Sequence, residues 1–79
     1  MKNPKGIQAF ATHLRRLRDD KQISQQELAD ISDISKKTIQ RIENAKSSPT
    51  VDVLISLSRA MKIPMSELMD FHLPREKNV

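Results

Sequence analysis

Residues 24–44 read SQQELADISDISKKTIQRIEN, and this stretch decides the fold of the chain. Ser24 and Glu27 stand three positions apart, the spacing of a capping box that starts a helix. Asp33 interrupts the helical pattern, and Asp tolerates the left-handed backbone of a tight turn better than most residues. Ser35 can then cap a second helix. The stretch therefore predicts two short helices joined by a tight turn.

Each of these two helices has an apolar side. The first is expected to bury Leu28, Ala29 and Ile31, and the second Ile39 and Ile42. With 3.6 residues per turn, four long polar side chains of the second helix fan across roughly 140° of its other surface. They are Lys36, Lys37, Gln40 and Arg41.

This polar surface has the chemistry that duplex DNA requires. Arg and Lys donate to guanine O6 and N7, and Gln pairs with adenine N6 and N7, so the second helix suits a major groove. We expect Arg41 to make a bidentate contact with guanine. The alternative is that these are ordinary solvated side chains on an exposed helix.

The composition limits what else the chain can be. At 79 residues, 37% of them hydrophobic, it has room for one domain with a small core and not for a deep enzyme cleft. The absence of Cys excludes a disulfide framework and a thiolate metal site. A net charge of +4 and a pI of about 9.8 suit a polyanionic partner, although many soluble proteins are mildly basic.

A longer helix is predicted ahead of this stretch. Asn3 is a suitable N-cap, and Pro4 suits the first helical position. The helix should run to about Lys21, with His13 on its outer face. Apolar residues recur along it at helical spacing, at Ile7, Phe10, Ala11, Leu14 and Leu17.

Two further helices are predicted after Pro49. Thr50 can cap one of them and Pro64 can start the other, a short one. A single Gly and the absence of Tyr and Trp disfavour a sheet, so the fold should be all-α. We expect an N-terminal arm or helix start at residues 1–5, one domain at residues 6–71 and a flexible tail at residues 72–79.

Several short groups of residues stand at a characteristic spacing along the chain. They are Ser24-Gln25, Glu27-Leu28-Ala29, Ile34-Ser35, Thr38-Ile39, Ile42-Glu43-Asn44, Pro49 and Glu67-Leu68. With them the chain resembles the XRE family of bacterial regulators and the lambda-type phage repressors, from about Gly6 to Phe71. The resemblance implies a five-helix, lambda-repressor-like DNA-binding domain with its helix-turn-helix at the second and third helices.

Three positions depart from the family pattern. Asp33 and Ala45 stand where the family usually or often has Gly, and Pro64 replaces the polar cap of the last helix. Ala in a left-handed conformation costs roughly 1 kcal/mol or more. Either Asn44 takes that conformation instead, or the helix ends differently.

The resemblance and the chemistry together suggest two sets of DNA contacts. The expected base-reading residues are Ser35, Lys36, Lys37, Gln40 and Arg41. The expected phosphate contacts come from the start of the first short helix, from Thr38 and from the loop after the second, where helix N-termini and cations favour an anion. They are Ser24, Gln25, Thr38, Asn44, Lys46 and Ser47. The alternatives are an idle surface residue for Gln25 and a solubilising charge for Lys46.

The resemblance also implies a structural ion pair between Arg18 and Glu43. In the phage-repressor branch, residues at these two positions form a partly buried pair that ties the first helix to the third. On this hypothesis Glu43 orients the reading helix. The alternative is two exposed charges without a partner.

A homodimer on a palindromic operator is expected, because one helix in a groove reads few base pairs. The candidate dimer interface consists of apolar residues toward the C-terminus. They are Val53, Met65, Met69, Phe71 and Leu73. The alternative is that Met65 and Phe71 only close the core of one subunit.

We therefore expect a sequence-specific regulator of transcription that binds double-stranded DNA, most often as a repressor. Short phage repressors and restriction–modification controller proteins resemble it in length and layout. The alternative is an antitoxin or a protein-interaction adaptor on the same fold.

No other chemistry is predicted for the chain. It shows no Ser with a plausible base and orienting acid, no glycine loop for a nucleotide, and two isolated His, so neither enzyme activity, cofactor, metal nor small-molecule ligand is expected. No apolar run approaches the ~20 residues of a membrane span, and the N-terminus has no apolar signal core. We expect a cytoplasmic, nucleoid-associated protein.

Overall fold

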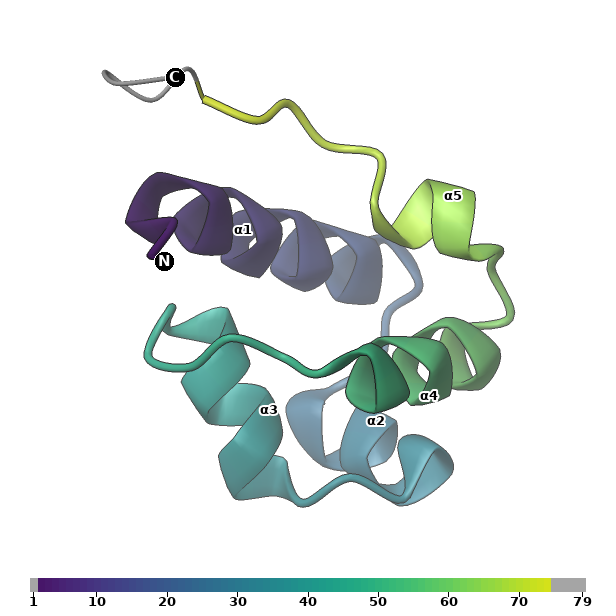
Figure 1. Cartoon of the computed structure of the whole chain (residues 1–79). Helices are drawn as coiled ribbons and strands as arrows, with labels where there is room; N and C mark the ends of the chain where they lie inside the picture. The colour runs from purple at the N-terminus through teal and green to yellow at the C-terminus, as the bar shows by residue number, and fades with distance from the viewer. Residues whose placement is uncertain (1, 75–79) are drawn as a thin grey trace.

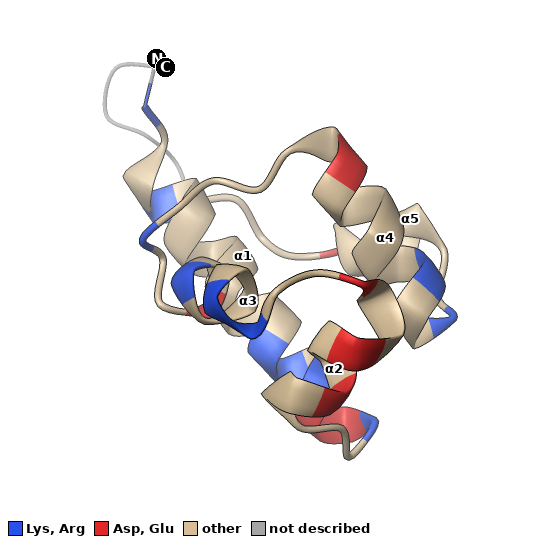
Figure 2. Cartoon of the chain, turned by 90° about the horizontal axis from the view of Figure 1, so that it is seen from below, with Lys and Arg blue, Asp and Glu red and all other residues tan. Residues whose placement is uncertain are grey.

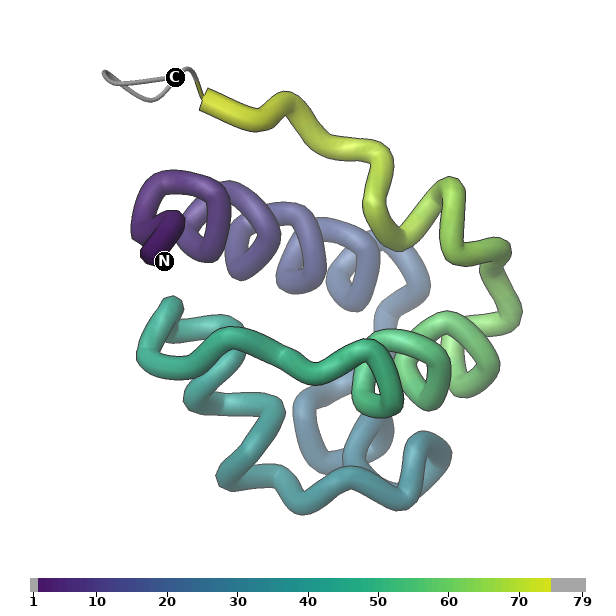
Figure 3. Tube along the Cα trace, in the orientation of Figure 1, coloured from purple at the N-terminus to yellow at the C-terminus, as the bar shows by residue number. Residues whose placement is uncertain are grey.

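The computed structural model describes residues 2–74 and arranges them as five α-helices without a strand (Figure 1). The trace in Figure 3 shows α2 turning into α3, which rises toward α1 before residues 44–50 lead into α4. This architecture confirms the predicted all-α, five-helix fold. The helices are α1 (Pro4–Asp20), α2 (Gln25–Ser32), α3 (Lys36–Glu43), α4 (Val51–Met61) and α5 (Met65–Leu68).

Side-chain caps fix where three of the helices begin. Ser24 Oγ accepts a hydrogen bond from the Glu27 amide at 3.0 Å, and the Glu27 carboxylate accepts one from the Ser24 amide at 2.9 Å. This confirms the predicted capping box of α2. Ser35 caps α3 and Thr50 caps α4 as predicted, each through its hydroxyl oxygen and without a reciprocal bond. Pro4 is the first residue of α1, but the Asn3 side chain makes no capping hydrogen bond there.

Left-handed residues fix how the helices end. Asp33, at φ 60° and ψ 31°, makes the tight turn between α2 and α3, as the sequence predicts. After α3 the left-handed residue is Ala45, at φ 57°, and not Asn44, at φ −94°. Because its Cβ is unfavourable there, Ala45 holds roughly 1–2 kcal/mol of strain at the start of the loop after α3.

The core lies between α1, α2, α3 and α4, and α5 closes one end. Its buried members are Phe10, Leu14, Leu28, Ala29, Ile39, Ile42, Leu57, Met61, Ile63 and Leu68.

The prediction that Ile31 belongs to the core is wrong, because 57% of its surface is exposed. The inward face of α2 is centred on Leu28, Ala29 and Ser32, and Ile31 points roughly 100° away from that centre. Ser32 takes the place near the turn, where its hydroxyl oxygen accepts a hydrogen bond from the Ile34 amide at 3.3 Å.

The segment after α5 folds back onto α1. The Phe71 ring packs against Phe10, with the ring centroids 5.8 Å apart, and against His13, at 5.6 Å. His13 Nε2 also lies 2.9 Å from the carbonyl oxygen of Glu67. The expectation that His13 lies on the open outer face of α1 is therefore wrong, because α5 and the segment after it half-bury the ring.

The predicted flexible tail lies only partly within the structure. Residues 72–74 are described, and Leu73 lies against Gly6 of α1. Residues 75–79 are outside the described part of the chain, as is Met1. None of the helices between residues 2 and 74 combines the length and the apolar character that crossing a bilayer requires.

The carboxylate of Glu43 joins the first three helices. Arg18 of α1 donates to it twice, from Nε to Oε2 at 2.8 Å and from Nη2 to Oε1 at 3.0 Å. Gln25, the first residue of α2, donates to Oε1 at 3.0 Å. The Glu43 side chain is 0% exposed and that of Arg18 13%, so the pair implied by the family resemblance is present and nearly buried. This pairing also raises the pKa of Arg18 above its usual value.

Removing Arg18 and removing Glu43 should lower the free energy of unfolding by different amounts. Arg18→Met leaves the buried carboxylate of Glu43 without its main cation, so the free energy of unfolding should fall by about 3–5 kcal/mol. Glu43→Gln leaves Arg18 near water and near Asp19, so the fall should be about 1–3 kcal/mol. Urea denaturation of the two variants measures both values. Equal losses, or a larger loss in Glu43→Gln, would contradict this assignment.

The strain at Ala45 gives a second prediction. Ala45→Gly should raise the free energy of unfolding by about 0.5–1 kcal/mol, because relief of the left-handed strain exceeds the entropy that Gly adds to the unfolded chain. Ala9→Gly makes the same change inside α1 and should lower the free energy by about 1 kcal/mol. The two variants are compared by urea denaturation. A destabilised Ala45→Gly protein would show that this position is not strained.

Candidate nucleic-acid interface

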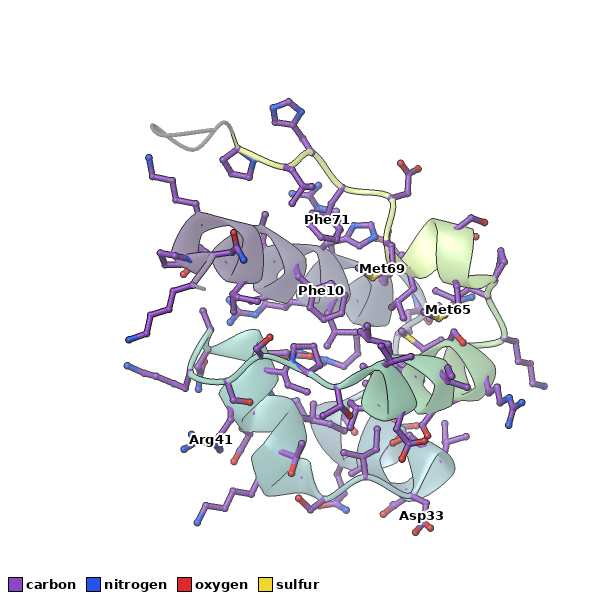
Figure 4. The ribbon with its side chains drawn as sticks, in the orientation of Figure 1. Phe10, Asp33, Arg41, Met65, Met69 and Phe71 are labelled. Carbon is purple, nitrogen blue, oxygen red and sulfur yellow. The ribbon has the colours of Figure 1, made fainter. Side chains whose placement is uncertain are left out.

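The outer side of α3 carries the polar residues that the sequence singles out. All four of its long polar side chains are exposed, and Ile39 and Ile42 on the opposite side are buried. Figure 4 shows Arg41 directed away from the other helices. These exposed residues are Lys36, Lys37, Gln40 and Arg41.

Ser35 is more constrained than its neighbours on α3. Its hydroxyl accepts a hydrogen bond from the Thr38 amide at 3.1 Å and donates one to Thr38 Oγ1 at 2.8 Å. The hydroxyl hydrogen of Ser35 is therefore already used inside the protein. Any base contact by Ser35 has to use the remaining acceptor site of this oxygen.

The start of α2 offers backbone donors beside α3. The amide groups of Gln25 and Gln26 open the helix and have no intrahelical acceptor, as at every helix N-terminus. One N–H of the Gln25 side-chain amide donates to Glu43, and the Ser24 hydroxyl oxygen accepts the capping hydrogen bond. This end of α2 therefore presents backbone N–H groups together with the second N–H and the oxygen of the Gln25 amide.

The loop after α3 is hydrogen-bonded to the C-terminal end of that helix. The Asn44 amide donates to the Gln40 carbonyl at 2.9 Å, and the Lys46 amide donates to the Arg41 carbonyl at 2.8 Å. Asn44 and Lys46 are exposed and Ser47 is half-buried. The left-handed turn at Ala45 permits this arrangement, so the backbone of this loop is fixed relative to α3.

The charges are unevenly distributed around α3. Figure 2 shows basic positions on α3 and acidic positions on the adjacent α2. Within residues 2–74, every ion pair involves Arg15 or Arg18, so the cations of α3 and Lys46 have no carboxylate partner there. A polyanion would therefore approach from the α3 side and avoid the outer face of α2.

The residues expected at a dimer interface do not form one uniform surface. Met65, Met69 and Leu73 are exposed, whereas Val53 and Phe71 are half-buried against the core. Figure 4 shows Met69 and Phe71 near Phe10, and Met65 on α5. An open apolar hollow of about 810 Å³ is lined in part by Met69, Phe71 and Leu73, together with Ile7, Phe10 and Leu54.

The described residues do not form a metal site, and the apolar hollow lies apart from α3. Between residues 2 and 74, no three His, Cys, Asp or Glu side chains come together as they would at a metal ion. No residue of α3 lines the apolar hollow. The exposed polar side of α3 is thus the candidate site.

Sequence reasoning gave no role to Arg15, which lies beside this site. Arg15 Nη2 donates to the backbone carbonyl of Glu43, the last residue of α3, at 2.9 Å. One signal was available, since Arg15 precedes Arg18 by three positions and so shares its side of α1. The contact itself follows from how α1 packs on α3, which the sequence pattern does not fix.

Comparison with known proteins agrees with this geometry. A family model described as helix-turn-helix, HTH_3, matches residues 14–68. The HTH-type transcriptional repressor RghR of Bacillus subtilis is 36% identical over 64 residues, which are 80% of this chain and 47% of RghR. The chain thus spans about half the length of this curated relative.

Two solved structures share the fold. The restriction-modification controller protein C.AhdI from Aeromonas hydrophila is 27% identical, with a TM-score of 0.76 over 78% of this chain and 94% of its own. An HTH_3 family transcriptional regulator from Vibrio cholerae has a TM-score of 0.81 over 85% of this chain and 38% of its own. At 24% identity, the second likeness concerns the fold alone.

These relatives are named as regulators of transcription and a controller protein, and none of them as an enzyme. The match at residues 14–68 covers more than half of the chain, and it agrees with the resemblance seen in the sequence. The chain therefore belongs to the HTH_3 helix-turn-helix family, which is of the XRE type.

Proposed function

We propose that this protein is a sequence-specific DNA-binding regulator of transcription that reads the major groove with α3. One observation carries the proposal: a helix packed on its apolar side presents four exposed groove-reading side chains on the other, none of them paired within residues 2–74. Because its relative RghR is named a repressor, we propose that this chain also represses transcription. Such a regulator would work in the cytoplasm, at the nucleoid.

The proposed complex divides its contacts between phosphates and bases. Phosphate contacts fix the register of the protein on the duplex and carry no sequence information, whereas contacts with base edges specify the site. We assign base reading to the outer side of α3, with Arg41 on guanine and Gln40 on adenine. The backbone of α2 at Gln25, Thr38 and the loop with Asn44, Lys46 and Ser47 would hold the phosphates.

We further propose a homodimer on a palindromic operator. α3 has eight residues, so a single copy reads few base pairs, and a two-fold pair doubles the site with half-sites about 34 Å apart. The exposed Met65, Met69 and Leu73, together with the apolar hollow, suit the interface. Val53 contributes less, since the core already contacts much of its side chain.

The exposed apolar residues also favour a second candidate, an antitoxin or adaptor that binds another protein. Besides the C-terminal group, α2 and α4 expose apolar side chains at Ile31, Val51 and Ile55. Such a protein would bind DNA weakly and without regard to sequence. Salt dependence and base preference therefore separate the two candidates.

Selection of bound duplexes from a random pool tests the proposed function. A regulator should enrich one two-fold symmetric site, and its affinity should fall steeply with salt because bound phosphates release counterions. A pool without any enriched sequence would contradict the proposal and favour the adaptor.

Two substitutions should separate base reading from phosphate binding. Arg41→Ala should lose about 1–3 kcal/mol of binding to the selected site and relax the preference at one base position. Lys46→Ala should weaken selected and scrambled duplexes by the same factor. Titration of both variants against a set of single-base operator variants measures these effects. A Lys46→Ala protein with altered base preference would refute the division.

The dimer interface gives a further prediction. Met69→Glu places a charge in the proposed apolar contact and should shift the protein from dimer to monomer in sedimentation at micromolar concentration. Ile31→Glu adds the same charge at an exposed apolar residue outside that contact and should leave the dimer intact. Particles of only ~9 kDa for the unmodified chain would rule out the dimer.

A further inference from the structure

Arg15 has a guanidinium group that the fold fixes but uses only in part. Its Nη2 donates to the Glu43 carbonyl at 2.9 Å, which is its one hydrogen bond within residues 2–74. A guanidinium has five N–H donors in a fixed fork. The Arg15 side chain is 53% exposed, so the remaining donors face water.

The positive charge of Arg15 is also in excess. Its nearest carboxylate oxygen, Glu43 Oε1, lies 3.9 Å from Nε. Glu43 already receives two hydrogen bonds from Arg18, at 2.8 and 3.0 Å, and one carboxylate neutralises one guanidinium. Asp19 approaches Arg18 and not Arg15. A cation without its own counter-ion on a half-exposed surface favours an external anion.

The position of Arg15 indicates which anion. Its Nη2 touches the last residue of α3, directly before the loop of Asn44–Ser47. Its Nε faces the same Glu43 oxygen that accepts from Gln25 at the start of α2. Arg15 thus lies between the two groups of proposed phosphate contacts, which come from different helices.

Arg15 also supplies a positive charge, which the neutral Gln25 amide lacks. One N–H of the Gln25 side-chain amide is used by Glu43, and the N–H that remains belongs to a neutral group. The free edge of the Arg15 guanidinium is a charged donor at the same junction, held there by its bond to the end of α3.

We infer that Arg15 binds a phosphate of the DNA backbone and joins the contacts of α2 to those of the loop after α3. This inference rests on the proposed function and adds a third helix, α1, to the DNA-binding surface. Arg15 anchors one donor on the reading helix and offers the others to the phosphate, so it sets the distance between helix and backbone.

The test compares Arg15→Gln with Arg16→Gln in the full chain. Both variants lose one positive charge from α1, but Arg16 is exposed and makes no contact with Glu43. Affinity for the selected duplex and for a scrambled duplex of equal length is measured from 50 to 200 mM salt. Loss of one phosphate contact should lower the slope of log affinity against log salt by about 0.9 for Arg15→Gln on both duplexes, and leave it unchanged for Arg16→Gln.

Over that fourfold range of salt, the Arg15→Gln protein should lose about 3.5-fold less affinity than the unmodified chain. Arg15→Lys keeps the charge and should keep the slope. Equal slopes for Arg15→Gln and the unmodified chain, or equal changes for Arg15→Gln and Arg16→Gln, would overturn the inference. A melting temperature lowered by Arg15→Gln without a change of slope would also overturn it and leave a purely structural role.

Failure of the proposed function gives a different result. In that case the unmodified chain itself shows no preference for the selected over the scrambled duplex. Normal preference in the unmodified chain, with an unchanged slope in Arg15→Gln, rejects the role of Arg15 alone.

Discussion

The buried carboxylate of Glu43 is the constraint on which the rest of the structure depends. A charge without water must have its hydrogen bonds satisfied, and Arg18 from α1 and Gln25 from α2 supply them. A hydrophobic contact at this place would tolerate rotation of α3. The bidentate ion pair instead fixes both the distance between α1 and α3 and the direction in which α3 faces. The net stability of such a pair is small, and its loss is costly. We interpret Glu43 as the residue that sets the orientation of α3.

Orientation of α3 matters because its two sides have opposite tasks. Ile39 and Ile42 pack into the core, so a rotation about the axis would withdraw them from it and redirect the polar side of α3. The same residue, Glu43, is bonded through its backbone to Arg15. The C-terminal end of α3 thus carries the buried ion pair that stabilises the fold and lies beside the proposed DNA contacts. The strained Ala45 turn follows directly after it.

The sequence predicts the parts of this structure that depend on neighbours along the chain. The caps at Ser24 and Ser35 and the left-handed turn at Asp33 are local hydrogen-bonding and steric preferences, and they are where the sequence places them. The direction of Ile31 was predicted wrongly, because an eight-residue helix offers too few turns to define its inward face. Whether Asn44 or Ala45 is left-handed also stayed open, since the packing of α3 decides it.

The residue pattern alone could not predict contacts between helices, and the Arg18–Glu43 pair was expected only from the family resemblance. The base-reading residues expected on α3 lie on its exposed side because helical periodicity determines that side. The bond from Gln25 to Glu43, and the role of Arg15, depend on how α1 and α2 pack against α3, as does the place of His13 beneath Phe71.

Amide perturbation mapping by NMR tests the central claim most directly. The isotope-labelled chain is titrated with the duplex that it selects from a random pool, and the shifted amides are located on the fold. We expect the largest shifts in α3, at the start of α2 and in residues 44–47, with the middle of α4 unchanged. Shifts concentrated on α4 and α5, with α3 unaffected by the duplex, would contradict it.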